Sequence, residues 1–226
     1  NLFDYMNGHF ARSNTESDKQ SWMWKRARGY FDIVTTKSTN GNVNHNLGVV
    51  PEMVWYKRRS GADDWFVCTA TDGYLFLNQN ARNQGYGNGS YLTNAYGAQA
   101  TSTTVNTGYN FTGVTTADMV IYLFATVSGV SKVGSFTQSG ATNVDCGFTG
   151  DTPSFLLLKR TDTTDNWRVF DSTRGLVAGN DKVLNINRNA AQSDDSDLID
   201  PNSGGFATTS NLANGDYIFY AIAATS

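Results

Sequence analysis

The side chains best suited to binding chemistry gather in one Tyr-rich stretch. Residues 83–97 alternate Tyr with Gly, Asn and Ser. Tyrosine rings can stack on sugar faces, and the neighbouring amides and hydroxyls can bond sugar hydroxyls, as in adaptable recognition loops. We therefore predict a glycan-contact surface, without metal or covalent chemistry, formed by Tyr86, Asn88, Ser90, Tyr91, Asn94 and Tyr96. The alternative is a loop that packs against its own domain or against a sister subunit.

A second stretch is acidic. Four carboxylates fall within seven residues, namely Asp194, Asp195, Asp197 and Asp200. Hard oxygen ligands of this kind can hold calcium. The stretch lacks the spacing of an EF-hand loop, which needs Gly at its sixth position and Glu at its twelfth. A solvated acidic turn is the alternative that the composition favours.

Catalytic signatures are missing from the sequence. Its two histidines, His9 and His45, fit no repeated pattern, and no nucleophile elbow, phosphate loop, zinc motif or dinucleotide fingerprint occurs. We expect a protein that is not an enzyme, with no cofactor and no bound metal. A carboxylate pair for glycoside hydrolysis leaves no sequence signature, so a glycan-degrading enzyme stays as an alternative. Cys68 and Cys146 are too few for a disulfide framework and are expected to be small buried residues.

The sequence contains two similar copies of one pattern. Residues that both copies keep can therefore be distinguished from residues that only one copy has. Residues 51–58 return as residues 153–160, and six residues then intervene in both copies before Trp65 and Trp167. The organisation that follows is a lead-in arm at 1–28, a first repeat at 29–129 and a second repeat at 130–226. Residues that both copies keep are expected to be structural, with both tryptophans in the core: Pro51, Pro153, Trp65 and Trp167. Sugar-stacking platforms are the alternative for the two tryptophans.

The difference between the copies lies in the Tyr-rich stretch. From Ala81 to Val120 there are 39 positions, whereas from Ala190 to Ile218 there are 28. The additional residues of the first copy fall around residues 83–97. What only one copy has is a better candidate for function than what both copies share.

Each repeat is predicted to form a set of short strands. Residues 53–57 and 155–159 are apolar runs without polar alternation, which is typical of strands covered on both faces. Turn-forming residues separate each run from a second strand at residues 65–68 and 167–170, so each copy contains a β-hairpin. Further strands are predicted at residues 31–36, 74–77 and 120–126, and at 133–137, 183–186 and 217–223. The sequence therefore predicts an all-β, antiparallel β-sandwich built from two tandem, pseudo-symmetric repeats in one closely packed body.

Two groups outside this pattern need partners. Trp22 and Trp24 precede the first repeat and must be buried against it or against a neighbouring subunit. Lys57-Arg58 and Lys159-Arg160 end the two apolar runs, beside aspartates in the hairpin turns. Salt bridges across each hairpin, or a charged surface for an anionic polymer, are the two interpretations.

Composition excludes several classes of protein. A net charge of −3 without a basic stripe argues against nucleic acid as a partner. No apolar run of membrane-spanning length occurs, so membrane insertion is not expected. The chain begins at Asn1 rather than Met, and we expect a fragment, a processed product or part of a longer protein.

Three strings, at residues 28–34, 46–53 and 122–136, carry a family resemblance. Across residues 22–226 the chain resembles a tandem-repeat domain of unknown function that recurs in tail-fibre and other virion proteins of cyanophages and marine phages. The resemblance implies a bacteriophage structural protein, assembled in the host cytoplasm and exposed on the virion, with other virion proteins as partners. It also implies a homo-oligomer, with a trimer favoured, and a possible host surface glycan as ligand. A tail-fibre or appendage module that displays loops for host contact is our first expectation, and a head or tail decoration protein that stabilises the particle is the alternative.

Overall fold

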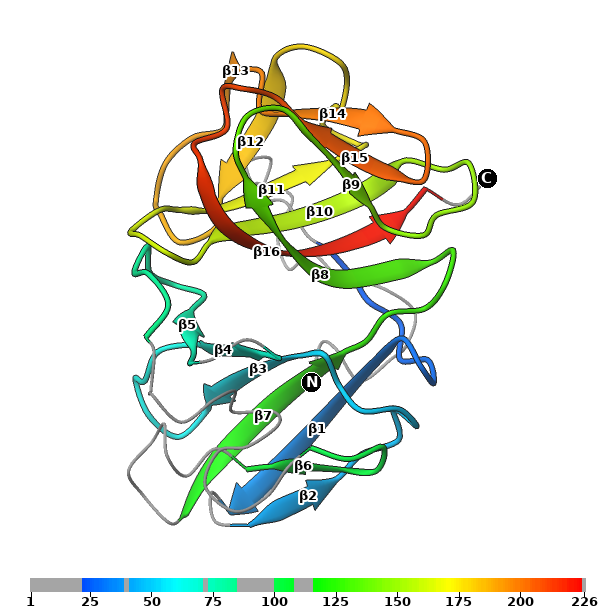
Figure 1. Cartoon of the computed structure of the whole chain (residues 1–226). Helices are drawn as coiled ribbons and strands as arrows, with labels where there is room; N and C mark the ends of the chain where they lie inside the picture. Colours follow the sequence, from blue (N-terminus) through cyan, green and yellow to red (C-terminus); the bar gives the residue numbers. More distant parts are fainter. Residues whose placement is uncertain (1–21, 39–40, 71–72, 85–99, 108–115, 225–226) are drawn as a thin grey trace, which may run out of the picture.

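The computed structural model describes residues 22–38, 41–70, 73–84, 100–107 and 116–224. These residues form strands and turns and contain no helix, so the all-β prediction is confirmed. The described part of the chain accordingly has no helix that could cross a membrane. Two main antiparallel sheets lie one above the other, the first half of the chain below and the second half above (Figure 1).

The first half builds a five-stranded sheet in the order β1-β7-β3-β4-β5. Its strands are β1 (Phe31–Ser38), β3 (Met53–Arg58), β4 (Phe66–Thr69), β5 (Leu75–Phe76) and β7 (Thr116–Phe124). A two-stranded ladder of β2 (Asn42–Asn44) and β6 (Thr104–Asn106) lies on its outer side (Figure 1). The first strand of the half therefore pairs with the last one, and the hairpin β3-β4 follows.

The second half builds a six-stranded sheet in the order β13-β12-β11-β10-β16-β8. Its strands are β8 (Ser131–Gln138), β10 (Pro153–Arg160), β11 (Trp167–Asp171), β12 (Asp181–Asn185), β13 (Ser193–Ser196) and β16 (Gly215–Ala223). A three-stranded ladder of β14 (Ile199–Asn202), β15 (Gly205–Thr208) and β9 (Thr142–Asp145) covers the outer side. Here too the first strand pairs with the last one, followed by the hairpin β10-β11.

The apolar runs of β3 and β10 serve two cores at once. Met53 and Trp55 of β3 belong to a cluster that also holds Phe155 and Leu157 of β10 and thus joins the two halves. The alternate residues face outward, because successive side chains of a strand point to opposite faces. In β3 these are Val54 and Tyr56, which pack under β2 and β6; in β10 they are Leu156 and Leu158, which pack under β9, β14 and β15. Both faces are covered, which explains the missing polar alternation.

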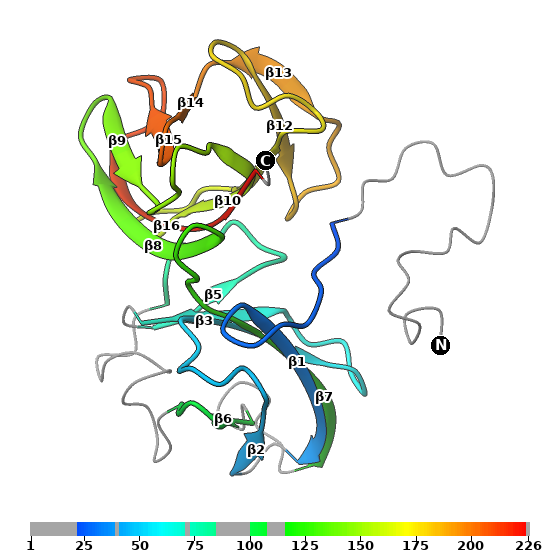
Figure 2. The same ribbon diagram turned by 90° about the vertical axis from the view of Figure 1, so that its right-hand side faces the viewer.

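The lead-in segment ties the two halves together. Trp24 meets Trp55 and Phe124 of the first half edge-on, with ring centroids 6.0 and 5.9 Å away, and Phe155 of the second half at 5.8 Å. The indole Nε1 of Trp22 donates a hydrogen bond of 3.0 Å to Asp171 of the second half. In Figure 2 this blue segment runs from the level of the upper half down to the start of β1. Both tryptophans therefore pack on the body of the chain itself.

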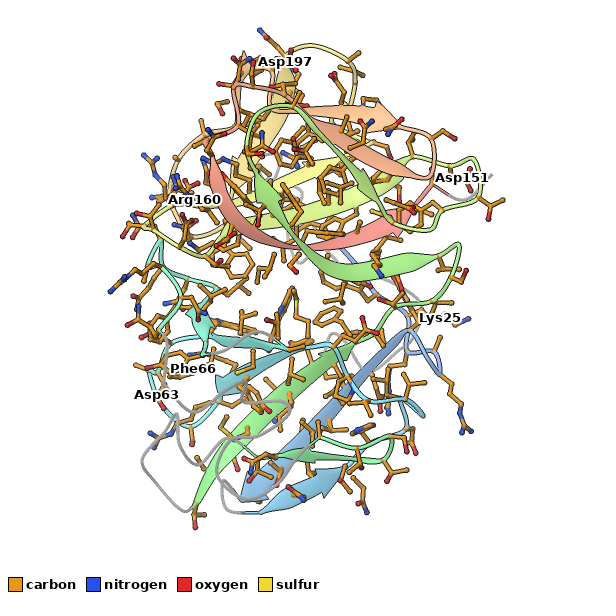
Figure 3. All side chains as sticks on the ribbon, viewed as in Figure 1. Lys25, Asp63, Phe66, Asp151, Arg160 and Asp197 are labelled. Atoms are coloured by element: carbon orange, nitrogen blue, oxygen red, sulfur yellow. The ribbon has the colours of Figure 1, made fainter. Side chains whose placement is uncertain are left out.

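Backbone hydrogen bonds also cross the junction. Asp165 N donates to the carbonyl of Asn80 at 2.9 Å, and Asn83 N donates to that of Thr161 at 2.8 Å. Figure 3 shows side chains of both halves filling the space between the two sheets. The halves form a continuous packed unit rather than beads on a linker.

The expected structural residues have different environments. Trp167 is fully buried and belongs to the cluster between the sheets. Trp65 is only half-buried and contacts Tyr122 in a tilted arrangement at a centroid distance of 5.8 Å, so the prediction of a core position for Trp65 is wrong. The reason is its place before β4, which begins at Phe66, whereas β11 begins at Trp167 itself. Pro51 and Pro153 are both buried, and Pro153 opens β10, where a strand tolerates a residue without an N–H.

Candidate functional site

The Tyr-rich stretch begins at the junction of the two halves. Tyr86, Asn88, Ser90, Tyr91, Asn94 and Tyr96 lie outside the described residues. The residues just before them are firmly held, because Gln84 N donates to Tyr74 O at 2.9 Å and Asn83 N donates to Thr161 O at 2.8 Å. The described structure resumes at Ala100, which is buried in the outer core of the first half. The described residues on either side of the Tyr-rich stretch therefore belong to well-packed parts of the fold.

The acidic stretch is not a turn. Ser193–Ser196 forms the edge strand β13, which pairs with β12, and Asp194 makes an exposed ion pair of 2.9 Å with Lys182. This hydrogen bond lowers the pKa of Asp194. Asp200 accepts a hydrogen bond from Gly179 N at 3.3 Å, and the side chain of Asp195 lies outside the described part. Within the described residues, no group of three or more His, Cys, Asp or Glu side chains has the geometry of a metal site.

The buried carboxylate of this region is Asp181, which sequence reasoning missed. One of its oxygens accepts hydrogen bonds from Leu198 N at 2.7 Å and Ile199 N at 2.9 Å, while the other has no partner in the described structure. Burial raises the pKa of Asp181 to about 6, and the nearby charges of Asp197 and Asp200 act in the same direction. Asp181 thus fixes the bend between β13 and β14.

The charged hairpins contain salt bridges. Arg58 bonds Asp63 at 3.2 Å, and Arg160 bonds Asp162 through two contacts of 2.7 and 3.0 Å. Figure 3 marks Asp63 and Arg160 at the two hairpins. Lys159 is fully buried and donates to the carbonyl of Arg160 at 2.7 Å. Burial lowers the pKa of Lys159 to about 8. Ion pairing across the hairpins, one of the two interpretations of the sequence, is what the structure shows.

Two asparagines hold the tryptophans in matching ways. The side-chain oxygen of Asn78 accepts a hydrogen bond from Trp65 N at 2.8 Å, and that of Asn187 accepts one from Trp167 N at 2.8 Å. Both belong to the architecture rather than to a binding site.

His45 and the two cysteines also have structural roles. His45 is buried, its Nδ1 accepts a hydrogen bond from Leu47 N at 3.2 Å, and burial lowers its pKa, so the imidazole is neutral near pH 7. Cys68 and Cys146 are free and buried, as expected, and burial raises the pKa of each thiol, that of Cys146 to about 12. Such thiols are poor nucleophiles.

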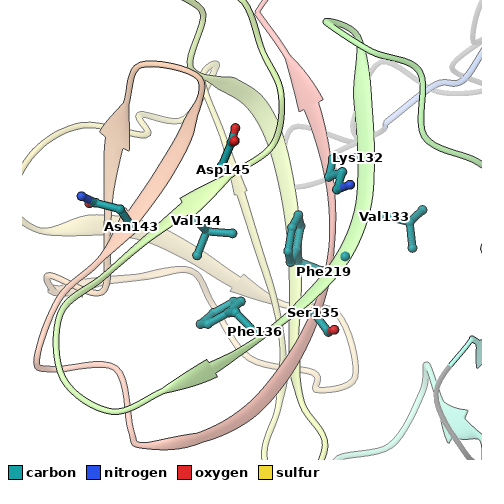
Figure 4. Close-up of a pocket in the computed structure, with 9 residues that line it drawn as sticks. Lys132, Val133, Ser135, Phe136, Asn143, Val144, Asp145 and Phe219 are labelled. Carbon is teal, nitrogen blue, oxygen red and sulfur yellow. The ribbon is translucent and has the colours of Figure 1, made fainter.

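A groove lies between β8 and β9 in the second half. We call it the β8–β9 groove, a cavity of about 360 Å³ lined by Lys132, Val133, Gly134, Ser135, Phe136, Asn143, Val144, Asp145 and Phe219. Figure 4 shows Phe219, Phe136 and Val144 between the two strands, with Lys132 at one end. Lys132 has no ion-pair partner among the residues that the structure describes. A further pocket, of about 400 Å³, is lined by Thr35, Thr36, Lys37, Arg59 and Asp118 of the first half.

The two halves differ at the second residue of their first strand. Asp32, the second residue of β1, accepts hydrogen bonds from Asn46 N and from Arg26, both at 2.6 Å. Lys132, the second residue of β8, has no acceptor atom in its side chain and no ion-pair partner among the described residues. Asp32 is therefore held by its neighbours, whereas Lys132 lines the β8–β9 groove.

The floor of the β8–β9 groove depends on a glycine. Gly134 lies opposite Phe219 in the ladder, and a Cβ atom on Gly134 would lie 2.5 Å from the phenyl ring. At the corresponding rungs of the first half, Val34 lies opposite Ile121. The second half therefore has a glycine and a phenyl ring where the first half has two branched side chains.

The comparisons with known proteins give a family. The family described as Domain of unknown function (DUF7483) matches residues 4–225, nearly the whole chain. The chain belongs to the DUF7483 family. No curated protein matches the chain significantly, and no solved structure does so either. DUF7483 membership spans both halves, so the two sheets are parts of one family unit.

Proposed function

We propose that this DUF7483 chain is a non-enzymatic structural module of a bacteriophage particle, in a tail fibre or related appendage, that presents the Tyr-rich stretch to the host surface. The observation that carries the proposal is the place where this stretch leaves the fold. Asn83 bonds Thr161 of the other half immediately before it. A binding segment that starts at the junction of two packed sheets and ends at the buried Ala100 of the first half is anchored on a rigid scaffold, which limits the ordering cost of contact.

The finer architecture belongs to the same proposal. We infer that the molecule is an antiparallel sandwich of two tandem, pseudo-symmetric repeats. The shared strand order β1-β7-β3-β4-β5 and β8-β16-β10-β11-β12 supports this view. The matching bonds from Asn78 to Trp65 and from Asn187 to Trp167 support it as well. Duplication would leave one copy free to acquire the longer stretch.

The resemblance to phage tail-fibre and virion domains supplies the biological setting. Its partners would be other virion proteins, further copies of the chain in a trimer, and a host surface glycan. Neither nucleic acid nor a membrane interior is a partner in this scheme, which fits the net charge of −3. The protein would be made in the bacterial cytoplasm and exposed on the particle.

Locating the protein on the particle tests this proposal. Antibodies against the purified chain should label the distal end of tail appendages in electron micrographs. Uniform labelling of the head or tail surface would instead identify a decoration protein. Depolymerisation of host glycan by the purified chain would overturn the non-enzymatic assignment.

A further inference from the structure

The β8–β9 groove is bounded by the free edges of two different sheets. β8 is the edge strand of the six-stranded sheet and pairs with β16, whereas β9 is the edge strand of the three-stranded sheet and pairs with β15. Only residues 139–141 connect the two strands, yet no ladder joins them in the described structure. An edge strand presents unpaired N–H and C=O groups and is a template for another strand.

Hydrogen bonds show which backbone groups of β8 turn away from β16. Val133 N donates to the hydroxyl of Thr126 at 3.2 Å rather than to β16. Antiparallel strands alternate the direction of their backbone groups, so Ser135 turns its N–H and C=O to the same side as Val133. The side chain of Ser135 is exposed.

The same reasoning applies to β9. Cys146 N donates to Gly204 O at 2.9 Å, next to the register in which Asp145 lies opposite Gly205. The alternation therefore turns the backbone groups of Asp145 and Asn143 away from β15. Apart from Val133 N, which Thr126 already holds, both walls offer outward-facing peptide groups at the spacing of an extended chain.

The closed end of the groove is fixed by a buried network. Gln138 is buried, donates to Thr209 O at 2.9 Å and accepts from the hydroxyl of Thr208 at 2.6 Å. Thr208 in turn accepts a hydrogen bond from Thr142 N at 3.1 Å. This network holds the end of β8 beside the start of β9, so the groove exists before any ligand arrives.

We propose that the β8–β9 groove takes an extended peptide segment of a neighbouring protein, which adds a strand to β8. The hydrogen-bonding capacity of the walls is mostly backbone, and Figure 4 shows Val133 and Asn143 pointing away from the space between the strands. The apolar side chains of Phe136, Val144 and Phe219 lie in this space, and Lys132, Ser135 and Asp145 also line the groove. The apolar part matches a strand with alternating apolar residues better than a sugar. Lys132 has no ion-pair partner among the described residues and can pair with an acidic residue of the segment, although Asp145 lines the same groove.

The test uses a defined peptide. The probe is an eight-residue acetylated and amidated peptide of alternating Thr and Val that ends in Glu, titrated into the whole chain by NMR. Its matched control is the same peptide with alternate backbone nitrogens methylated, which keeps the side chains and removes the N–H groups. We expect the probe to bind at least tenfold more tightly than the control and to slow hydrogen exchange at the amide of Ser135.

Two variants separate pairing from packing. Ser135→Pro removes an N–H that faces the groove and not β16, so the fold should survive, because edge strands tolerate proline at such positions. It should weaken probe binding at least tenfold, whereas Ser135→Ala should leave binding unchanged. A thermal melt of Ser135→Pro within a few degrees of the parent confirms the fold, and a collapsed melt would contradict the assigned direction of this N–H.

Several results would overturn the proposal. These are no binding of the probe, equal binding of the methylated control, a saccharide that competes for the groove, or self-association of the chain that Ser135→Pro abolishes. The proposal rests on the proposed function only for the source of the segment, a neighbouring protein of the particle. If Ser135→Pro abolishes probe binding while particles that carry it adsorb normally to host cells, both the peptide-binding proposal and the proposed function are supported. If Ser135→Pro leaves probe binding intact while adsorption is lost, the peptide-binding proposal alone is overturned.

Discussion

The indole Nε1 of Trp167 donates a hydrogen bond of 2.8 Å to the backbone carbonyl of Phe76. This bond joins β11 of the second half to the end of β5 in the first half. Trp167 is fully buried, whereas its counterpart Trp65 is half-buried and belongs to no core cluster. The tryptophan of the second half is therefore a core residue, and the tryptophan of the first half is not. We expect substitution of Trp167 to lower the free energy of unfolding more than substitution of Trp65.

Trp167→Ala should destabilise the chain by about 3–5 kcal/mol, since it removes a large core side chain and leaves a cavity. Trp167→Phe should cost less, because most of the packing remains and chiefly the bond to Phe76 is lost. Trp65→Ala is the matched control and should cost well under half as much as Trp167→Ala. Chemical denaturation measures all three, and equal costs for the two alanine variants would contradict the difference in burial.

Trp24→Ala should lower the free energy of unfolding by about 2 kcal/mol, because this half-buried ring contacts aromatic residues of both halves. Met23→Ala removes a neighbour whose side chain is 66% exposed and should change stability by less than about 0.5 kcal/mol. Limited proteolysis should also become faster at the junction in Trp24→Ala. Equal stability of the two variants would show that the lead-in segment does not hold the halves.

Gly134→Val should destabilise the second half by about 1–3 kcal/mol, because the new side chain collides with Phe219. The double variant Gly134→Val with Phe219→Ile restores the pair that the first half has in Val34 and Ile121, and it should recover most of the loss. Thermal melts of the parent, both single variants and the double variant form a double-mutant cycle. If the losses of stability in the two single variants simply add in the double variant, the two pairs of residues are not equivalent.

The raised pKa of Asp181 predicts that the stability of the fold falls as the pH rises through about 6. Its folded pKa of about 6 lies above the ordinary value of 3.8, so the folded state binds this proton more tightly than the unfolded state. The stabilisation from the neutral acid is complete below the ordinary value and is lost as the pH rises through about 6. Asp181→Asn stays neutral, so its melting temperature relative to the parent should be higher at pH 7 than at pH 4. A constant difference at the two values would contradict the raised pKa.

Much of the strand framework could be predicted from the sequence because burial on two faces leaves a pattern. The continuous apolar runs of β3 and β10 predicted doubly covered strands, and the all-β class follows from them. The hairpins and the closing strands β7 and β16 were predicted close to their observed bounds. Trp22 and Trp24 were predicted to need burial, and the body of the chain provides it.

The shortest polar strands could not be predicted from the sequence. β2, in an outer ladder, is Asn-Val-Asn, and β13, the edge strand of the six-stranded sheet, is Ser-Asp-Asp-Ser, so both have the composition of turns. Ladder pairing, which joins residues far apart in the chain, makes them strands. The role of Asp181 depends on its burial under residues 198 and 199, and the β8–β9 groove depends on Gly134 lying opposite Phe219. Such relationships exist only once the chain has folded.

The most direct test of the account is a triple substitution of Tyr86, Tyr91 and Tyr96 by Ala in the complete particle. The second copy lacks this segment, so the fold does not require these rings, and the thermal melt of the purified chain should stay nearly unchanged. The matched control replaces three exposed residues elsewhere by Ala, namely Val49, Val130 and Val177. We predict that adsorption to host cells is abolished by the tyrosine variant and is normal for the control. Normal adsorption by the tyrosine variant, or a collapsed melt, would contradict the claim that this stretch makes the host contact.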